Sequence, residues 1–142
     1  MYSRLLVALQ FGLIGVMLVL GRGIVNSPAG LALFAVGAAV GVWALAHNRL
    51  GNFNIRPDLR EGCVMVNSGP YRYVRHPMYT SVLTMMAGVV VATPTVCEAV
   101  FFAALFVVLS LKALREERLW CEHHDGYVRY KRTTKMFVPW VW

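Results

Sequence analysis

One short polar segment, residues 69–79, carries most of the side chains that could do chemistry. It reads Gly-Pro-Tyr-Arg-Tyr-Val-Arg-His-Pro-Met-Tyr and stands directly before a long apolar run. His76 precedes a proline, which disfavours a helical backbone for it, and Pro77 suits the first position of a helix. We therefore expect His76 to cap a helix. The free N–H groups of its first turn, with Arg72 and Arg75 nearby, would attract a carboxylate or phosphate.

The same segment holds three tyrosines, Tyr71, Tyr73 and Tyr79, which offer flat ring faces and hydroxyl groups. Together with the arginines they suit an anionic group that is joined to an aromatic or apolar body. A second interpretation stays open. In it the arginines anchor the chain to lipid head groups, the tyrosines form an interfacial aromatic belt, and His76 is only a cap.

The acidic pair Glu116–Glu117 is a second candidate for chemistry, because it follows an apolar run that we expect to be helical. The helix macrodipole disfavours acidic groups near the carboxyl end of a helix. Adjacent helical residues point about 100° apart, so we expect the two carboxylates to have different roles. One would pair with Lys112 or Arg115, and the other would accept hydrogen bonds from a ligand ammonium. The alternative is two surface salt bridges, each worth about 0–1 kcal/mol.

Two further clusters lie beyond the acidic pair. Residues 121–125 read Cys-Glu-His-His-Asp, but no second cluster supplies distant ligands, so we expect no metal site. The three cysteines of the chain lack redox or metal spacing and predict no disulfide framework. Tyr127 and Tyr130 are candidates for substrate binding, with simple packing as the alternative.

The elements that position these residues are expected to be membrane helices. Of the 142 residues 58% are hydrophobic and only 15% are charged, whereas soluble domains have about 25% charged residues. Four apolar runs predict four spans, at residues 5–20, 29–46, 77–93 and 96–114. The last two form a helical hairpin across Pro94, and the fourth helix continues past the membrane through Arg118. We therefore predict an all-α fold in one domain, residues 1–142, with two spans in residues 1–48 and the motifs in residues 49–142.

Small residues indicate how these spans pack against one another, and charges indicate how the spans are oriented across the membrane. Gly12 and Gly15 in the first run allow close helix contact, and Gly37 and Gly41 in the second form a small-xxx-small pair that predicts tight packing on a neighbour. All 14 Lys and Arg residues except Arg22 fall on one side of a four-span chain. By the positive-inside rule both termini, the acidic pair and the polar connection at residues 47–76 are cytoplasmic. A loop of that length without clear secondary structure often has a functional role.

Other interpretations of the composition are less favoured. The net charge of +7 could suggest nucleic acid as a partner, but the basic residues flank the apolar runs, so we expect membrane lipid and no nucleic acid. Only Arg4 precedes the first apolar run, and no usual cleavage site follows it. We therefore expect that run to be a permanent span rather than a cleaved signal peptide.

The motifs resemble the isoprenylcysteine carboxyl methyltransferase and phospholipid methyltransferase superfamily. That family shows a Gly-Pro-Tyr-Arg block leading into Arg-His-Pro-x-Tyr, a helical hairpin, a Glu-Glu segment, a Tyr-x-x-Tyr pair and a late proline. These stand here, in the family's order, at residues 69–72, 75–79, 116–117, 127–130 and Pro139. The family often has glycine where this chain has Ser81, and Phe-Gly in place of His123 and His124.

The resemblance implies a multi-pass membrane enzyme, here expected in a bacterial inner membrane, that uses S-adenosylmethionine to methylate a lipidic or small acceptor. Isoprenylcysteine-type carboxylates are among such acceptors. It places the cofactor at the cytoplasmic ends of the last two helices. The residues implied for cofactor binding are Tyr71, Arg75, His76, Pro77, Tyr79, Glu116 and Glu117, with His76 and Arg75 also candidates for catalysis.

Two other functions stay open on the sequence. One is a membrane reductase related to sterol reductases, although the chain is short for holding both a dinucleotide and a sterol. The other is a non-catalytic membrane protein that keeps the hairpin as an interaction surface. The sequence predicts neither the methyl acceptor nor the oligomeric state.

Overall fold

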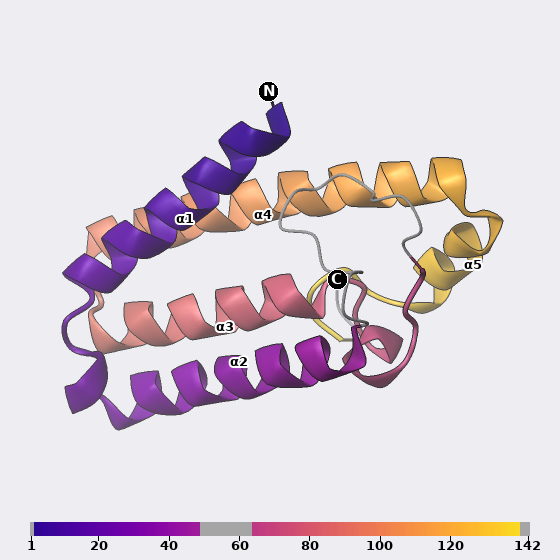
Figure 1. The fold of residues 1–142 in the computed structure, drawn as a ribbon. Coiled ribbons are helices and arrows are strands. Elements are labelled where there is room, and N and C mark those ends of the chain that lie inside the picture. The colour runs from indigo at the N-terminus through magenta and orange to yellow at the C-terminus, as the bar shows by residue number, and fades with distance from the viewer. Residues whose placement is uncertain (1, 49–63, 140–142) are drawn as a thin grey trace.

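A computed structural model describes residues 2–48 and 64–139 of the chain (Figure 1). Within those residues every regular element is helical, which confirms the all-α prediction. The elements are α1 (Tyr2–Leu20), η1 (Ile24–Asn26), α2 (Pro28–His47), η2 (Gly69–Arg72), α3 (Pro77–Ala92), α4 (Val96–His123) and α5 (Asp125–Thr133). Residues 49–63, the middle of the predicted polar connection, lie outside the described part.

The helices begin where the sequence provides caps. The Ser27 side chain accepts a hydrogen bond from the Gly30 N–H, and Pro28 follows as the first residue of α2. The Thr95 hydroxyl accepts from the Glu98 N–H at 3.2 Å and starts α4. The predicted spans therefore agree with the helices to within a few residues. α4 continues past its apolar run as predicted but ends at His123, five residues beyond Arg118, and α5 was not predicted.

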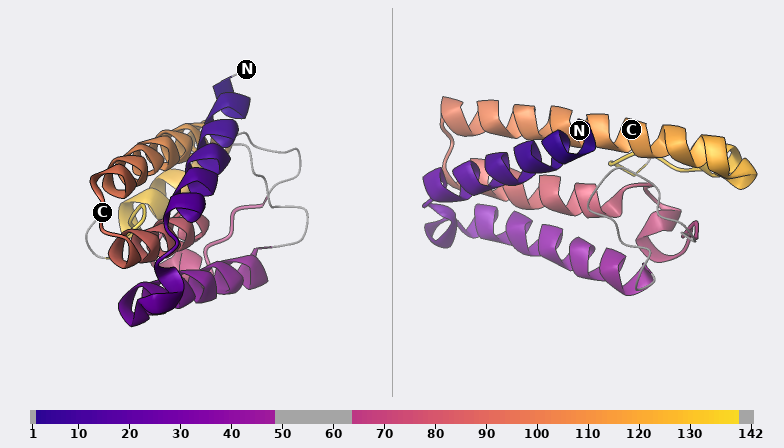
Figure 2. Two further views of the ribbon diagram at one scale, coloured as in Figure 1. Left: turned by 90° about the vertical axis from the view of Figure 1, so that its left-hand side faces the viewer. Right: turned by 45° about the horizontal axis from the view of Figure 1, so that its top comes forward.

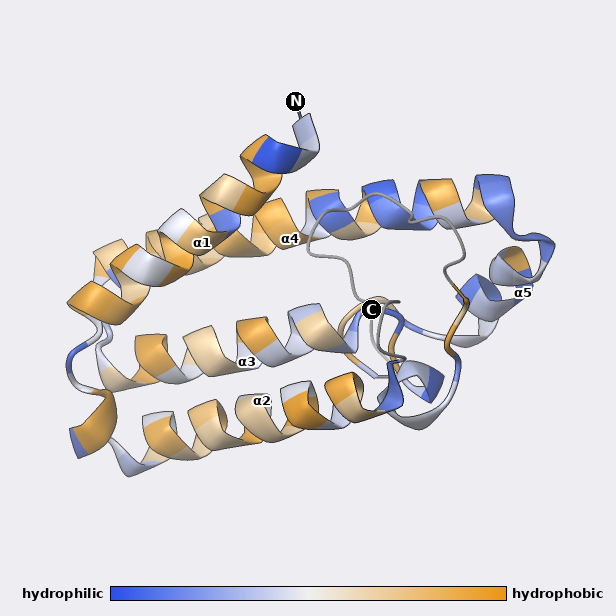
Figure 3. Cartoon of the chain, in the orientation of Figure 1, coloured by the Kyte–Doolittle hydropathy of each residue, from blue (hydrophilic) through white to orange (hydrophobic). Residues whose placement is uncertain are grey.

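Three described helices, α1, α2 and α4, are long and apolar enough to cross a membrane. The third predicted span, residues 77–93, corresponds to α3, which is apolar but has only 16 residues. Figure 3 shows that hydrophobic residues predominate along α1, α2, α3 and the first half of α4. Hydrophilic residues gather on the second half of α4, on α5 and around η2. The molecule thus has an apolar body and one strongly polar end.

The helices pack in two close pairs, α2 with α3 and α1 with α4 (Figures 1 and 2), and α3 also contacts α4. The α2–α3 contact depends on glycine. A Cβ atom on Gly30 would lie 2.7 Å from the Gly88 carbonyl oxygen, and one on Gly37 would lie 2.7 Å from the Met85 nitrogen. These backbones touch almost directly, as the small-xxx-small pair predicts.

The structure shows whether Ser81 and the glycines of α1, all noted in the sequence, take part in helix contacts. Ser81, where the related family often has glycine, does not separate α2 from α3. Its hydroxyl lies in the contact and donates to the Gly37 carbonyl at 2.7 Å. Gly12 and Gly15 of α1 have open space where a Cβ would be added. The close contact expected through them is therefore not formed among the residues that the structure describes.

The segment after α5 folds back beside the segment that precedes α3. The two run parallel and form an isolated bridge. The backbone N–H groups of Arg75 and His76 donate to the carbonyl oxygens of Lys135 and Met136, at 2.8 Å and 3.2 Å. Phe137 follows and is 1% exposed within the core. The start of α3 is thus held by residues about 60 positions later in the chain.

Candidate functional site

The two polar segments predicted to carry chemistry meet at the polar end of the molecule. His76 is the N-cap of α3 and Pro77 its first residue, as predicted. Glu116 and Glu117 lie on α4 beside that helix start, and both carboxylates reach the His76 ring. Residues some 40 positions apart therefore form one cluster.

Glu117 is the centre of this cluster. Its side chain is 1% exposed, and three basic groups surround its carboxylate. The Arg75 Nε donates to Oε1 at 2.6 Å, His76 Nε2 lies 3.3 Å from the same oxygen, and Lys131 Nζ lies 2.8 Å from Oε2. Arg75 also donates to the carbonyl oxygens of Lys131 and Thr134. A buried carboxylate is tolerated only with such compensation.

Glu116 faces the same ring from its other side. Its Oε2 lies 3.4 Å from His76 Nδ1, and its Oε1 accepts a hydrogen bond from the Tyr79 hydroxyl. The Tyr79 ring stacks on His76 with centroids 5.5 Å apart and planes 8° from parallel. Both glutamates therefore contact His76, which was not expected from their positions on the helix. They differ in exposure: the Glu116 side chain stays 19% exposed, whereas that of Glu117 is enclosed.

The charge state of His76 follows from these contacts. Burial by itself lowers the pKa of His76, but the hydrogen bonds and charges of Glu116 and Glu117 outweigh it and raise the pKa above its ordinary value. With a carboxylate at each ring nitrogen, the imidazolium form is favoured. His76 is therefore better suited to act as a fixed cation than as a general base at neutral pH.

This raised pKa predicts a pH dependence of stability. A group whose pKa is higher in the folded state stabilises the fold fully below the unfolded value, about 6.5. That contribution is lost as the pH rises through the folded value. We expect the melting temperature of the wild type to exceed that of His76→Gln at pH 6, and the gap to narrow at higher pH. Each kcal/mol lost lowers the midpoint by about 2–4 °C. Thermal unfolding of both proteins from pH 6 to 9 tests this, and a gap that widens with pH would contradict it.

The candidate tyrosines line the region between η2 and α5. The Tyr130 hydroxyl donates to the Tyr71 carbonyl, and Tyr127 packs between Trp120 and Tyr130. Burial, followed by the charge of Glu116, raises the pKa of Tyr71 to about 12. Burial also raises the pKa of Tyr127 and Tyr130 above the ordinary value. All three hydroxyls are protonated at neutral pH. Tyr127 is 4% exposed in this packing.

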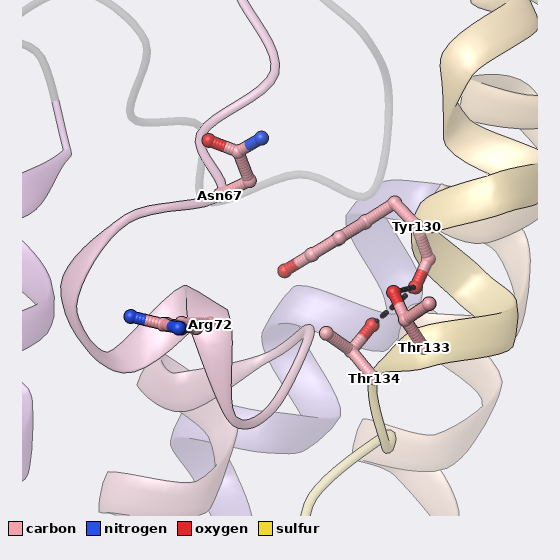
Figure 4. Close-up of a pocket in the computed structure, with 5 residues that line it drawn as sticks. All are labelled: Asn67, Arg72, Tyr130, Thr133 and Thr134. Carbon is pink, nitrogen blue, oxygen red and sulfur yellow. Dashed lines mark hydrogen bonds between the residues drawn. The ribbon is translucent and has the colours of Figure 1, made fainter.

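A pocket of about 310 Å³ opens beside the cluster. Figure 4 shows its lining, in which Tyr130 projects from α5 toward the segment that carries Asn67 and Arg72, and the hydroxyls of Thr133 and Thr134 lie at the base of Tyr130. The pocket joins the ion cluster through Thr134, whose carbonyl binds Arg75. Its volume is at the lower end of the range for small-molecule sites.

The histidines of the segment at residues 121–125 lie apart from this site. His123 and His124 are exposed at the end of α4, where His123 Nδ1 contacts the Leu119 carbonyl at 2.8 Å and His124 lies against Trp120. Among the described residues, no three His, Cys, Asp or Glu side chains lie close enough together to hold a metal ion.

Several site residues were not predicted. Lys131 and Thr134 come from α5 and the turn after it, where the sequence shows only a basic, polar run. Lys112 was expected to pair with a glutamate of its own helix. Its Nζ instead donates to Gln10 Oε1 of α1 at 2.5 Å and lies 5.1 Å from the centre of the Tyr79 ring. A lysine and a glutamine within two apolar runs were the available signal, because polar side chains are costly there.

Comparison with known proteins places these features in context. The profile of the isoprenylcysteine carboxyl methyltransferase (ICMT) family matches residues 30–125. That match begins in α2 and ends at the start of α5, so it includes the helical hairpin and both polar segments. No curated protein matches the sequence.

Proposed function

Because the chain belongs to the isoprenylcysteine carboxyl methyltransferase family, and so to a family of membrane methyltransferases, we propose that it transfers the methyl group of S-adenosylmethionine to a lipidic or small acceptor. One observation carries the proposal. Arg75, His76, Tyr79, Glu116 and Glu117 converge where two neighbouring helices reach the polar end of the molecule.

The residues present fit this methyl donor. S-adenosylmethionine has a carboxylate, an ammonium group, a nucleoside and an apolar sulfonium centre. Glu116 is the partner for the ammonium, because its carboxylate keeps an exposed face. Arg72, exposed in the pocket beside Asn67, is the partner for the carboxylate. The ring of Tyr71 suits the nucleoside.

Glu117 and Arg75 have a different role in this proposal. Glu117 is enclosed by three basic groups, so a ligand ammonium would have to displace one of them. We assign Glu117 to positioning: it fixes Arg75 and His76 and joins α3, α4 and α5. Pro77, which is buried, starts α3 at the point where His76 meets Glu117.

The donor, when bound, supplies a methyl group already activated by the sulfonium. The task of the chain is to hold donor and acceptor with the reacting atoms about 3–3.5 Å apart and to exclude water. A carboxylate acceptor is ionised at neutral pH and needs no base. The cationic His76 gives little help in deprotonating an amine, so the site favours an acceptor that is already anionic.

We also propose an orientation of the chain across the membrane. With α3 as a fourth, short span, the amino terminus, the polar end and α5 lie in the cytoplasm, following the distribution of basic residues. The cofactor then enters from the cytoplasm, and a lipidic acceptor enters from the bilayer between the helices. A span of 16 residues is short, but a bilayer thins locally around such a helix at modest cost.

Glu116→Gln tests the ammonium contact. We expect this substitution to weaken the binding of S-adenosylmethionine about tenfold, the usual effect of losing one hydrogen bond to a charged group. Thermal stability should change little, because the Glu116 side chain is partly exposed. Calorimetric titration of the full chain in detergent gives the affinity, with Glu122→Gln on the exposed surface of the same helix as the matched control. Equal affinities for Glu116→Gln and the wild type would remove Glu116 from the site.

A methyl-transfer assay tests the function itself. The full chain in lipid vesicles is supplied with labelled S-adenosylmethionine and a panel of prenylated carboxylates, phospholipid amines and small acids. We expect label in a carboxylate acceptor. Binding of a dinucleotide instead of the methyl donor would favour a reductase, and binding of neither would favour a non-catalytic role.

A further inference from the structure

The first helix contributes to the site although it lies outside the residues matched by the family profile. α1 spans Tyr2–Leu20, whereas the match begins at residue 30. Gln10 interrupts its apolar sequence. That side chain is 7% exposed and faces α4, where its Oε1 accepts a hydrogen bond from Lys112 Nζ at 2.5 Å.

Lys112 in turn contacts the aromatic ring that completes the ion cluster. It is 1% exposed, and its Nζ lies over the Tyr79 ring, 5.1 Å from the centroid. An ammonium group in that position is attracted by the ring face. Lys112 lies one turn before Glu116 on α4, and Glu116 accepts the hydrogen bond of the Tyr79 hydroxyl. Successive turns of α4 therefore hold Tyr79 by its ring and by its hydroxyl.

The orientation of Tyr79 matters because its ring also stacks on His76, with the planes 8° from parallel. A continuous series of contacts thus runs from the middle of α1 to the cluster: Gln10, Lys112, Tyr79, and then His76 and Glu116. Lysine and glutamine are rare inside membrane helices, and when present they are usually functional.

We propose that Gln10 and Lys112 form a positioning pair, in which Gln10 of α1 fixes the Lys112 ammonium and Lys112 fixes Tyr79 for cofactor binding. This inference rests on the proposed function and extends it, because it makes the first helix part of the methyl-donor site. Neither residue touches the reacting atoms.

The test uses Lys112→Met, Lys112→Arg, Gln10→Leu and the double variant of Gln10→Leu with Lys112→Met, each as the full chain in detergent. Binding of S-adenosylhomocysteine is measured by calorimetry and stability by thermal unfolding. We expect Lys112→Met to weaken binding about tenfold, while its melting temperature does not fall, because an ammonium is costly in an apolar interior. Lys112→Arg should restore most of the affinity, since it keeps a cation over the ring. The double variant should bind no worse than Lys112→Met, because Gln10 acts through Lys112.

The matched control is Arg118→Met, which removes an exposed cation from the same helix. Wild-type affinity in Lys112→Met would overturn the inference and leave the proposed function standing. A parallel loss of stability and binding that Lys112→Arg fails to rescue would also overturn it, since the pair would then be only structural. If the wild type itself binds neither S-adenosylhomocysteine nor S-adenosylmethionine, the proposed function fails, and this inference fails with it.

Discussion

Replacing Glu117 with glutamine is expected to abolish measurable binding of S-adenosylmethionine and to destabilise the protein. The carboxylate is 1% exposed and compensates the buried Arg75 and His76 as well as Lys131. Breaking a buried ion pair by removing one partner costs about 3–5 kcal/mol, because the other charge is left uncompensated. If Arg75 and His76 lose their positions, the affinity falls by a similar free energy, which is a factor of 100 or more at about 1.4 kcal/mol for each tenfold.

Two measurements separate binding from folding in this variant. Thermal unfolding gives the melting temperature, and calorimetry well below that temperature gives the affinity of the folded fraction. Lys131→Met provides a graded comparison. It removes a partner that is 45% exposed, so we expect a cost of about 0–1 kcal/mol. Glu117→Gln with wild-type affinity would show that the cluster does not support the site.

Replacing Gly88 with alanine is expected to separate α3 from α2. The added Cβ would lie 2.5 Å from the Gly30 carbonyl oxygen and 2.9 Å from the Phe34 nitrogen. Both are backbone atoms of α2, so the clash is relieved only by moving a whole helix. Overpacking typically lowers the free energy of unfolding by about 1–3 kcal/mol, occasionally more. We expect a clash between two backbones to cost an amount near the upper end of that range. Thermal unfolding in detergent measures the loss.

The first helix provides matched controls for this substitution. Gly12→Ala and Gly15→Ala place the same methyl group where nothing lies within 4 Å. Alanine favours a helix over glycine by about 1 kcal/mol, so these variants should melt at or above the wild-type temperature. If Gly88→Ala melts as they do, the close approach of α2 and α3 is not needed for stability.

Local rules were enough to predict α1, α2, α3 and α4 and the polar residues at their ends. Proline after His76 set the start of α3, and Thr95 set the start of α4. Apolar runs predicted the three long helices and the position of α3. The polar segment and the acidic pair were also correctly expected at the same end, because the hairpin of α3 and α4 between them returns the chain to that end. These features depend on residues only a few positions apart.

The contacts that organise the cluster depend on long-range packing and could not be predicted. Gln10 and Lys112 are separated by 102 residues, and no local pattern links them. α5 was missed because residues 125–133 form a basic, polar stretch without an apolar run, whereas packing of Tyr127 on Trp120 stabilises a helix there. One glutamate of the acidic pair was expected to pair with Lys112 or Arg115 of the same helix. The partners of Glu117 come instead from the start of α3 and from α5, which meet only once the helices have packed.

The return of the segment after α5 bears on how the protein is made. The carbonyls of Lys135 and Met136 accept from the backbone before α3, and that of Phe137 accepts from the Thr80 hydroxyl at 2.8 Å. A ribosome delivers those three residues after every helix described above. The hydrogen bonds that hold Arg75 and His76 can therefore form only after α3, α4 and α5 have been synthesised. Formation of the helices and completion of the ion cluster are in this sense separate steps.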